Sequence, residues 1–261
     1  MRRQVERLVK KTLRNFDAEI LFASLFGSYK RGEHDVHSDI DVFAVYEDGV
    51  GESGISRGLK RLERVLDRPV HVNLFNLKEF ERRLRFHDYL TASIIEDSSF
   101  ILGERDSFSE AKRYILNTPP DEESIRFNMK MGFSTFRRVY SSFDELNSIK
   151  PHHSRDLLDR VVRGLNDYRL ALGYIYAGAQ MQDTGKCASY KRLTHTSLGS
   201  VLKEIACIER EMKRRSKIEH AILSNLSKEI KNKSLRILAA EENSSRRLIS
   251  LIKSLRLVPS L

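Results

Sequence analysis

The sequence has few of the features that mark secreted or membrane-spanning proteins. Its 261 residues include two cysteines, Cys187 and Cys207, so a framework of disulfide bonds cannot form. Neither cysteine belongs to a C-x-x-C pair or lies near clustered histidines, which argues against a structural zinc site. No run approaches the roughly 18 consecutive apolar residues of a membrane helix, and the N-terminus lacks the apolar segment of a signal peptide. We therefore expect a cytoplasmic protein without a membrane partner.

The net charge of +10 is distributed unevenly along the chain. Residues 1–103 contain 17 basic and 17 acidic residues, whereas residues 104–261 contain 29 and 19. The stretch 184–236 alone has 13 basic and 5 acidic residues, and it includes Lys213, Arg214, Arg215 and Lys217. This excess suggests an anionic partner such as nucleic acid or an acidic protein. Solvated helix faces explain it equally well, because Lys and Arg are good helix formers.

The first hundred residues alternate between helical and strand patterns. The apolar spacing of residues 2–15 predicts a helix, and residues 20–26, 40–46 and 70–75 read as strands. Residues 47–58 are rich in Gly and Ser and predict a loop, which is followed by a short helix over 58–66 and another over 77–86. We expect a small domain with a mixed sheet over residues 1–104.

The second part of the chain reads as helical throughout. The segment from Thr118 to Glu123 combines prolines with three acidic residues, which is typical of a helix N-terminus. Apolar residues then recur with a period near 3.6 over residues 157–176 and 198–212. The expected fold class is therefore α+β, with an all-α helical bundle domain over residues 105–261. Tyr168, Tyr174 and Tyr176 either pack in that core or line a binding pocket.

The segment from Leu25 to Val42 contains the residues best suited to chemistry. Gly27 and Ser28 end one predicted strand, where a glycine allows a ligand to approach the backbone closely. Asp39 and Asp41 lie two residues apart at the start of the next strand, so both carboxylates face the same side. Two adjacent carboxylates repel each other unless a cation lies between them, and oxygen ligands suit Mg²⁺ bound together with substrate phosphates.

These residues resemble the signature of a known enzyme superfamily. Gly27-Ser28, Arg31-Gly32 and Ser38-Asp39-Ile40-Asp41 look like the G-S-x9-S-D-x-D pattern of DNA polymerase β-like nucleotidyltransferases. The likeness is greatest to the minimal and the aminoglycoside nucleotidyltransferases, and it covers about the first hundred residues. Domains of this kind often occur with helical domains of the HEPN or KNTase-C type, which the second part of the chain resembles.

The resemblance implies a mechanism and a role for each residue. Ser28, in the Gly27-Ser28 turn, would contact the triphosphate of an NTP, for which we expect ATP. Asp39 and Asp41 would bind Mg²⁺, and Ser38 would brace the turn into the strand. A hydroxyl of the acceptor, which is a protein, an RNA end or a small molecule, would then attack the α-phosphate while pyrophosphate leaves. This is the chemistry of class EC 2.7.7.

One departure from the family pattern concerns the third carboxylate, which a later strand usually supplies. The corresponding strand here, residues 68–75, contains no acidic residue, and His71 occupies the expected position. A neutral imidazole can act as a base, although Mg²⁺ prefers oxygen ligands. Glu33 and Glu47 are other acids that could take the role.

Two further functions stay open at this point. A nucleotidyltransferase domain without its third carboxylate could serve as a nucleotide- or partner-binding regulatory module of the antitoxin type. The helical part could instead bind or cleave RNA, because Arg215 and His220 fit the R-x4-H pattern of HEPN ribonucleases. An ordinary basic helix explains that pair as well.

Overall fold

The computed structural model describes residues 2–16, 19–32, 38–49, 52–146, 154–193, 195, 199–214, 220–241 and 245–254. The chain forms two compact units, Met1–Pro119 and Pro120–Leu261, which we call the N-terminal unit and the helical unit. The strands are β1 (Ile20–Phe26), β2 (Ile40–Tyr46), β3 (Val70–Asn76) and β4 (Ser99–Gly103). The helices of the N-terminal unit are α1 (Arg2–Leu13), η1 (Arg14–Phe16), α2 (Gly27–Arg31), α3 (Glu52–Leu66), α4 (Leu77–Arg85), α5 (Tyr89–Asp97) and α6 (Arg105–Asn117).

The four strands form one mixed sheet in the order β3-β2-β1-β4. β1 pairs antiparallel with both β2 and β4, whereas β2 and β3 run parallel. Parallel neighbours need a crossover connection, which α3 provides here. The α+β fold class that the sequence predicted, with a mixed sheet followed by helices, is confirmed.

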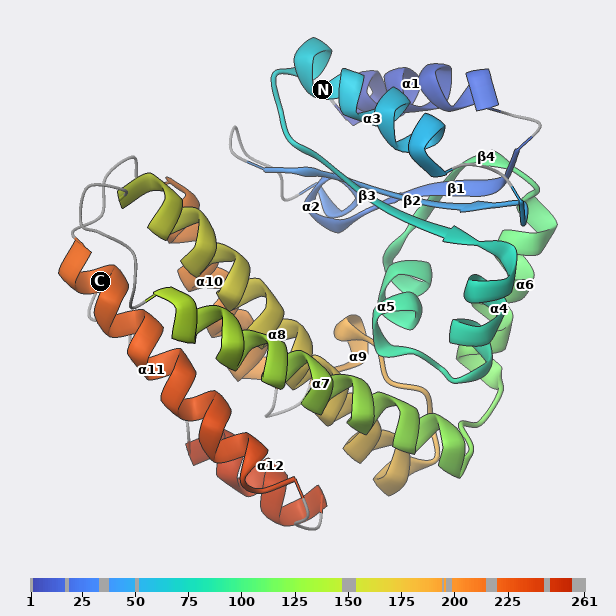
Figure 1. Cartoon of the computed structure of the whole chain (residues 1–261). Helices are drawn as coiled ribbons and strands as arrows, with labels where there is room; N and C mark the ends of the chain where they lie inside the picture. Colours follow the sequence, from blue (N-terminus) through green and yellow to red (C-terminus); the bar gives the residue numbers. More distant parts are fainter. Residues whose placement is uncertain are drawn as a thin grey trace. The chain divides into compact units, whose positions relative to one another are not determined.

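Helices cover both faces of this sheet (Figure 1). Alternate residues of β2 point to opposite faces, so Val42 packs with α1 and α3 while Phe43 packs with α4, α5 and α6. The second core is rich in aromatic rings, and Phe22 contacts Phe43, Phe80 and Phe108 at centroid distances of 5.4–6.0 Å. The sheet is therefore buried on both sides, and polar side chains reach solvent mainly at the strand ends.

The segment predicted as a loop over residues 47–58 is wrong in its second half. Helix α3 begins at Glu52 rather than at Gly58. Ile55, Leu59 and Leu62 are buried against the sheet at helical spacing, so tertiary packing outweighs the low helix propensity of the local Gly and Ser residues.

The helical unit contains no strand among its described residues. Its helices are α7 (Glu122–Leu146), α8 (Ser154–Thr184), α9 (Tyr190–Leu193), α10 (Gly199–Arg214), α11 (His220–Leu238) and α12 (Ser245–Ser254). The two longest helices, α7 and α8, follow each other in the chain and pack closely together. A Cβ atom at Gly132 of α7 would lie 2.7 Å from Cδ1 of Ile175 in α8, so the glycine permits this close approach.

The three tyrosines of α8 belong to the core of the helical unit. Tyr168, Tyr174 and Tyr176 are each at most 1% exposed. Burial raises the pKa of the Tyr168 and Tyr176 phenols well above the usual range. Core packing is therefore their use in this structure.

Across the described residues, no helix is both long enough and apolar enough to cross a membrane.

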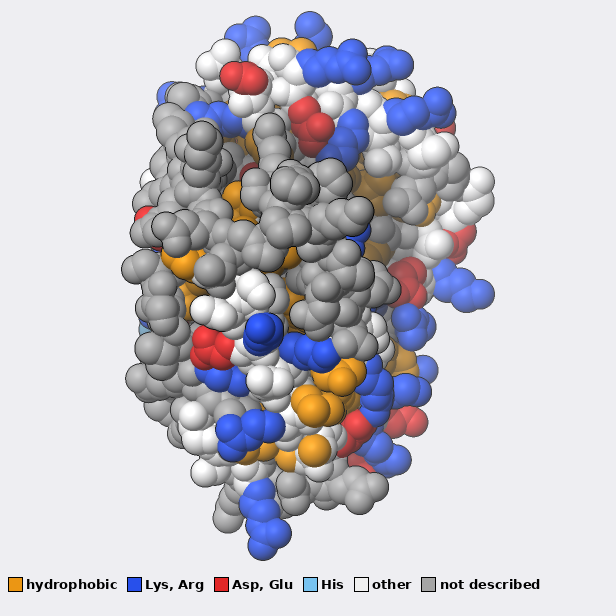
Figure 2. Space-filling model, turned by 60° about the vertical axis from the view of Figure 1, so that its left-hand side comes forward, with side chains coloured by type: hydrophobic (Ala, Val, Ile, Leu, Met, Phe, Trp, Pro, Cys, Tyr) orange, Lys and Arg blue, Asp and Glu red, His pale blue; other side chains and the backbone are white. Residues whose placement is uncertain are grey.

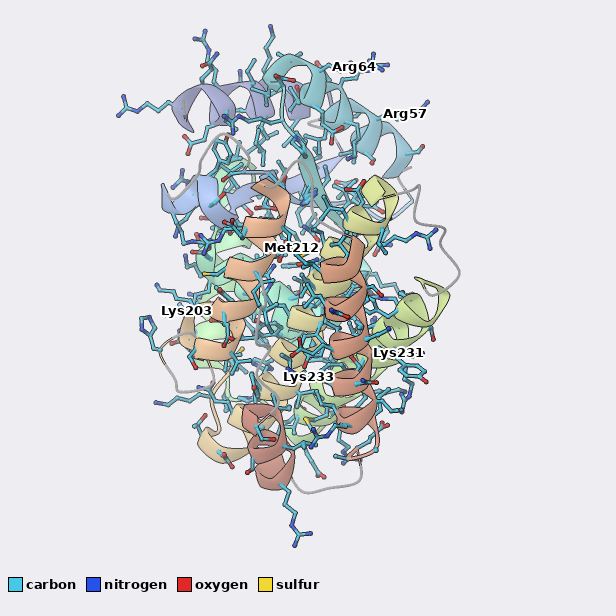
Figure 3. The ribbon with its side chains drawn as sticks, turned by 90° about the vertical axis from the view of Figure 1, so that its left-hand side faces the viewer. Arg57, Arg64, Lys203, Met212, Lys231 and Lys233 are labelled. Carbon is cyan, nitrogen blue, oxygen red and sulfur yellow. The ribbon has the colours of Figure 1, made fainter. Side chains whose placement is uncertain are left out.

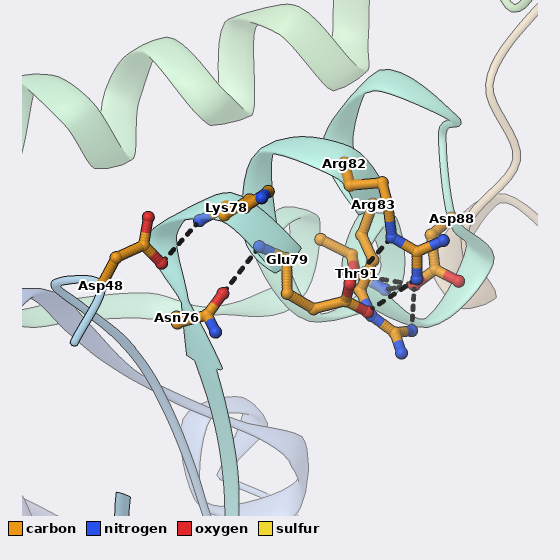
Figure 4. Close-up of polar contacts among 8 residues, drawn as sticks. All are labelled: Asp48, Asn76, Lys78, Glu79, Arg82, Arg83, Asp88 and Thr91. Atoms are coloured by element: carbon orange, nitrogen blue, oxygen red, sulfur yellow. Dashed lines mark hydrogen bonds and ion pairs between the residues drawn. The ribbon is translucent and has the colours of Figure 1, made fainter. Parts of the chain in front are cut away.

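A polar network holds the turn between α4 and α5 (Figure 4). Asn76 caps α4 by accepting a hydrogen bond from the backbone N–H of Glu79 at 2.8 Å. Asp88, which is fully buried, caps α5: its Oδ2 accepts hydrogen bonds from the backbone N–H and the hydroxyl of Thr91, at 2.9 and 2.7 Å. Arg83 lies 3.4 Å from the same oxygen. The carboxylate thus combines helix capping with charge compensation.

Replacing Asp88 should destabilise the N-terminal unit. We expect Asp88→Ala to lower its free energy of unfolding by about 2–3 kcal/mol, because the helix cap and a hydrogen-bonded buried charge are lost together. Glu81→Ala, an exposed acid of α4, should change it by at most about 0.5 kcal/mol. Urea unfolding of the full chain, followed by circular dichroism, measures both changes. Equal shifts in the two variants would contradict the role given to Asp88.

Candidate active site

Asp39 and Asp41 lie at the end of the sheet where β2 begins. Asp39 directly precedes the strand, and Asp41 is its second residue, paired with Phe26 of β1 on one side and with His71 of β3 on the other. The two carboxylic side chains are 16% and 24% exposed. They share the face of the sheet that packs on α4, α5 and α6, because positions 41, 43 and 45 alternate with the residues that face α1 and α3.

The imidazole of His71 lies next to both carboxylates. Its Nδ1 is 3.7 Å from Oδ2 of Asp39 and 3.7 Å from Oδ1 of Asp41. These distances exceed normal hydrogen-bond lengths but lie within the range of direct electrostatic attraction. The ring is 54% exposed and therefore accessible from solvent. The structure brings together the three residues that the sequence singled out as catalytic.

Gly27 lies directly against the carboxylate of Asp41. Its φ of +71° is in the left-handed region, and a Cβ atom built on it would lie only 2.1 Å from Oδ2 of Asp41. Any side chain at this position would be strained and would also displace the carboxylate. The close approach joins the glycine-serine turn to the carboxylate pair. Ser28 is the half-buried second residue of α2, and Ser38 precedes Asp39; their roles stay predictions.

Two ion pairs tie α2 to α5 behind the turn. Arg31 Nη1 and Lys30 Nζ lie 2.5 Å and 3.4 Å from the carboxylate of Asp97, which is 18% exposed. The ring of Tyr29 is buried on the other side, with the guanidinium carbon of Arg68 at 5.9 Å from its centroid. Asp97 therefore helps to hold the turn in place. No sequence signal indicated this role, because 66 residues separate it from Arg31.

Glu63 of α3 holds the start of β3, the strand that carries His71. Its Oε1 accepts hydrogen bonds from the ammonium of Lys60 at 2.7 Å and from the backbone N–H of Val70 at 3.0 Å. Hydrogen bonds from Lys60 and Val70, with the nearby charge of His71, lower the pKa of Glu63. Sequence reasoning missed this residue, because its bond to Val70 forms only when the fold brings the end of α3 against the sheet.

The other acids considered at the sequence level do not join this cluster in the described structure. Glu47 follows the last residue of β2, at the opposite end of the strand from Asp39 and Asp41. Its distance along the strand, roughly 20 Å at about 3.3 Å per residue, excludes it from the site. Glu33 lies outside the described residues.

The carboxylate pair suits a divalent cation that also binds phosphates. In the described part of the chain, no group of three or more His, Cys, Asp or Glu side chains is arranged to hold a metal ion by itself. Two adjacent, partly exposed carboxylates are nevertheless the usual protein share of a Mg²⁺ site, which substrate phosphates and water complete. The residues present therefore fit a cation that arrives with a nucleotide.

Several candidate residues of the helical unit belong to parts of the chain that the structure does not describe. Arg215 and Lys217 lie outside the described residues, as do the side chains of Lys213, Arg214 and His220. The basic run and the R-x4-H pair thus stay predictions.

Cys187 is buried and Cys207 is exposed, and both are free thiols.

Comparison with known proteins gives a family match for most of the N-terminal unit. Residues 5–102 match the sequence model of the family described as "Nucleotidyltransferase domain". No curated protein matches the chain. Among solved structures, the chain resembles one chain of a complex between a tri-AMPylated Shewanella oneidensis HEPN toxin and an MNT antitoxin (19% identity, 44% of this chain and 84% of that one, TM-score 0.32).

Two further solved structures show a similar degree of likeness. One is a toxin–antitoxin with AMP-PNP (21% identity, 41% of this chain and 81% of that one, TM-score 0.32). The other is spectinomycin adenyltransferase AAD(9) from Enterococcus faecialis with ATP and spectinomycin (13% identity, 89% of this chain and 97% of that one, TM-score 0.42). The family match assigns residues 5–102, which include Gly27, Ser28, Asp39 and Asp41, to the nucleotidyltransferase domain family.

Proposed function

We propose that this protein transfers a nucleoside monophosphate from ATP to a hydroxyl group of an acceptor and releases pyrophosphate, with Mg²⁺ bound by Asp39 and Asp41. The observation that carries the proposal is the contact between Gly27 and the Asp41 carboxylate, beside Asp39 and His71. It joins the turn expected to hold phosphate to the acids expected to hold the cation. The family match of residues 5–102 supports the same reaction class.

The reaction needs little covalent chemistry from the protein. A bond forms between the acceptor oxygen and the α-phosphorus, the bond from that phosphorus to the β-phosphate oxygen breaks, and the hydroxyl proton is released. The bound cation would supply charge neutralisation at the phosphates. Asp39 and Asp41 position that charge, the Gly27-Ser28 turn positions the phosphates, and His71 accepts the proton in place of the usual third carboxylate.

Removing either aspartate should abolish transfer but not folding. We expect Asp39→Asn and Asp41→Asn to lower the turnover number by at least about 100-fold. Their melting temperatures should stay at or above that of the wild type, because the mutual repulsion of the carboxylates is relieved. Label transfer from α-labelled ATP with Mg²⁺ measures the first effect. Glu110→Ala, an exposed acid of α6, is the control. Near wild-type turnover in both aspartate variants would contradict the proposed site.

The Gly27 contact gives an independent test. Gly27→Ala should weaken binding of Mg²⁺ with a non-hydrolysable ATP analogue by about 10–100-fold, because the new Cβ displaces the Asp41 carboxylate. Gly185→Ala is the matched control: its φ is +64°, but nothing lies within 4 Å of the added Cβ. Calorimetric titration compares the two variants. The same affinity in both would show that the contact has no part in binding.

Substitutions at His71 test whether it replaces the third carboxylate. His71→Ala should lower turnover by about 100-fold or more, whereas His71→Asp should keep or raise Mg²⁺-dependent transfer. His195→Ala removes an exposed histidine from the helical unit and should leave turnover unchanged. A fully active His71→Ala variant would show that His71 is an ordinary residue of the strand. Asp39 and Asp41 would then be the only residues assigned to the reaction as acids or metal ligands.

A further inference from the structure

The outward face of the α1/α3 layer carries a concentration of positive charge that the proposed reaction does not use. On α3, four exposed basic residues at helical positions i, i+3, i+4 and i+7 point away from the sheet and line one shallow hollow of about 380 Å³. They are Arg57, Lys60, Arg61 and Arg64. Figure 3 shows Arg57 and Arg64 on the outside of this helix.

The neighbouring helix α1 presents a second basic stripe on the same layer. Its buried residues Val5, Val9 and Leu13 face the sheet, so the opposite side of the helix faces solvent. That side carries four exposed basic residues: Arg3, Arg7, Lys11 and, directly after the helix, Arg14. Because α1 and α3 pack against each other on one face of the sheet, the two stripes lie side by side, at a helix spacing of about 8–10 Å.

Among the described side chains of these two helices, few acids compensate this charge. The described acidic side chains of the two helices are those of Glu6 and Glu63. Glu63 accepts hydrogen bonds from Lys60 and from the backbone of β3. Figure 2 shows Lys and Arg side chains gathered on the upper part of the surface, with fewer Asp and Glu side chains among them. This concentration is hidden in the composition, because residues 1–103 carry equal numbers of basic and acidic residues.

The chemistry of the surface favours a phosphate backbone over bases as the contacted group. The described residues of α1 and α3 include no aromatic side chain, and the nearby ring of Phe16 is half-buried against Gly54 and Gly58 of α3, so the layer does not offer the row of exposed rings on which single strands stack. The layer consists of two helices lying flat on a sheet, and neither projects as a recognition helix that could enter a major groove. A flat basic surface suits the wide, shallow minor groove of an A-form duplex and its flanking phosphates.

We propose that the α1/α3 layer binds double-stranded RNA through its phosphates, independently of base sequence. The carboxylate pair lies on the other face of the sheet, because Asp41 alternates with the residues that pack on α1 and α3. RNA binding on this layer is therefore separate from nucleotide binding at Asp39 and Asp41. The proposal does not depend on the proposed transfer reaction, and either one can fail without the other.

Binding of a fluorescent 20-base-pair RNA duplex to the full chain, measured by anisotropy over a range of salt concentrations, tests this proposal. One variant replaces Arg57, Lys60, Arg61 and Arg64 with Gln. It should weaken binding at least about 10-fold and reduce the slope of log affinity against log salt by about 3, as expected for four lost phosphate contacts. Two duplexes of unrelated sequence should bind equally well.

The matched control removes the same charge from exposed cations elsewhere. It replaces Arg126, Lys130, Arg137 and Arg138 of α7 with Gln; three of these four have acidic partners within 4 Å. This variant should bind the RNA duplex like the wild type. Both variants should keep the circular dichroism spectrum and the urea unfolding midpoint of the wild type, which shows that each is folded.

Four results would overturn the proposal. The first is no binding of the RNA duplex at 50 mM salt, and the second is an equal loss of affinity in the α3 and α7 variants. The third is equal or tighter binding of a DNA duplex with the same sequence, which would remove the assignment to RNA. The fourth is displacement of the RNA by polyglutamate at equal charge concentration, which would indicate a surface for acidic proteins.

Discussion

The position of the site depends on the register of β2 between its two neighbours. Antiparallel pairing places Phe26 of β1 opposite Asp41, and parallel pairing places His71 of β3 opposite the same residue. A shift of one residue in either pairing would turn a site side chain to the other face, because side chains alternate along a strand. Such a shift is opposed because both faces of β2 carry buried apolar residues. A displaced Asp41 carboxylate would be buried among them, which costs free energy.

The chain order explains how distant segments meet at one sheet end. β1 ends where β2 begins, so the turn after β1 is brought beside the first residues of β2. Because β3 runs parallel to β2, its first residues reach the same end after the crossover through α3. Glu63, near the end of α3, then bonds the backbone at the start of β3. The packing of α3 on the sheet therefore helps to fix the start of β3, the strand that carries His71.

Much of the N-terminal unit could be predicted from sequence because its signals are local. The strands that contain Asp41 and His71 are short apolar runs, and the glycine, serine and aspartate positions follow a signature of fixed spacing. The start of α3 could not be predicted, since buried contacts of Ile55 and Leu59 outweigh a Gly- and Ser-rich composition. The role of Asp97 and the side-by-side arrangement of the two basic stripes depend on segments that are distant in sequence and become neighbours only in the fold.

The two units differ in the order in which their segments can associate during synthesis. In the helical unit, the main partners α7 and α8 are consecutive, and the close approach at Gly132 joins neighbouring parts of the chain. In the N-terminal unit, β1 can complete its pairing only after β4 has been synthesised, because Ser99 of β4 pairs with Leu25 of β1. At about 5–20 residues per second, the ribosome needs several seconds to make the intervening chain. One edge of β1 is exposed for that time, so the nascent chain has a period of vulnerability to strand-mediated aggregation that ends when β4 emerges.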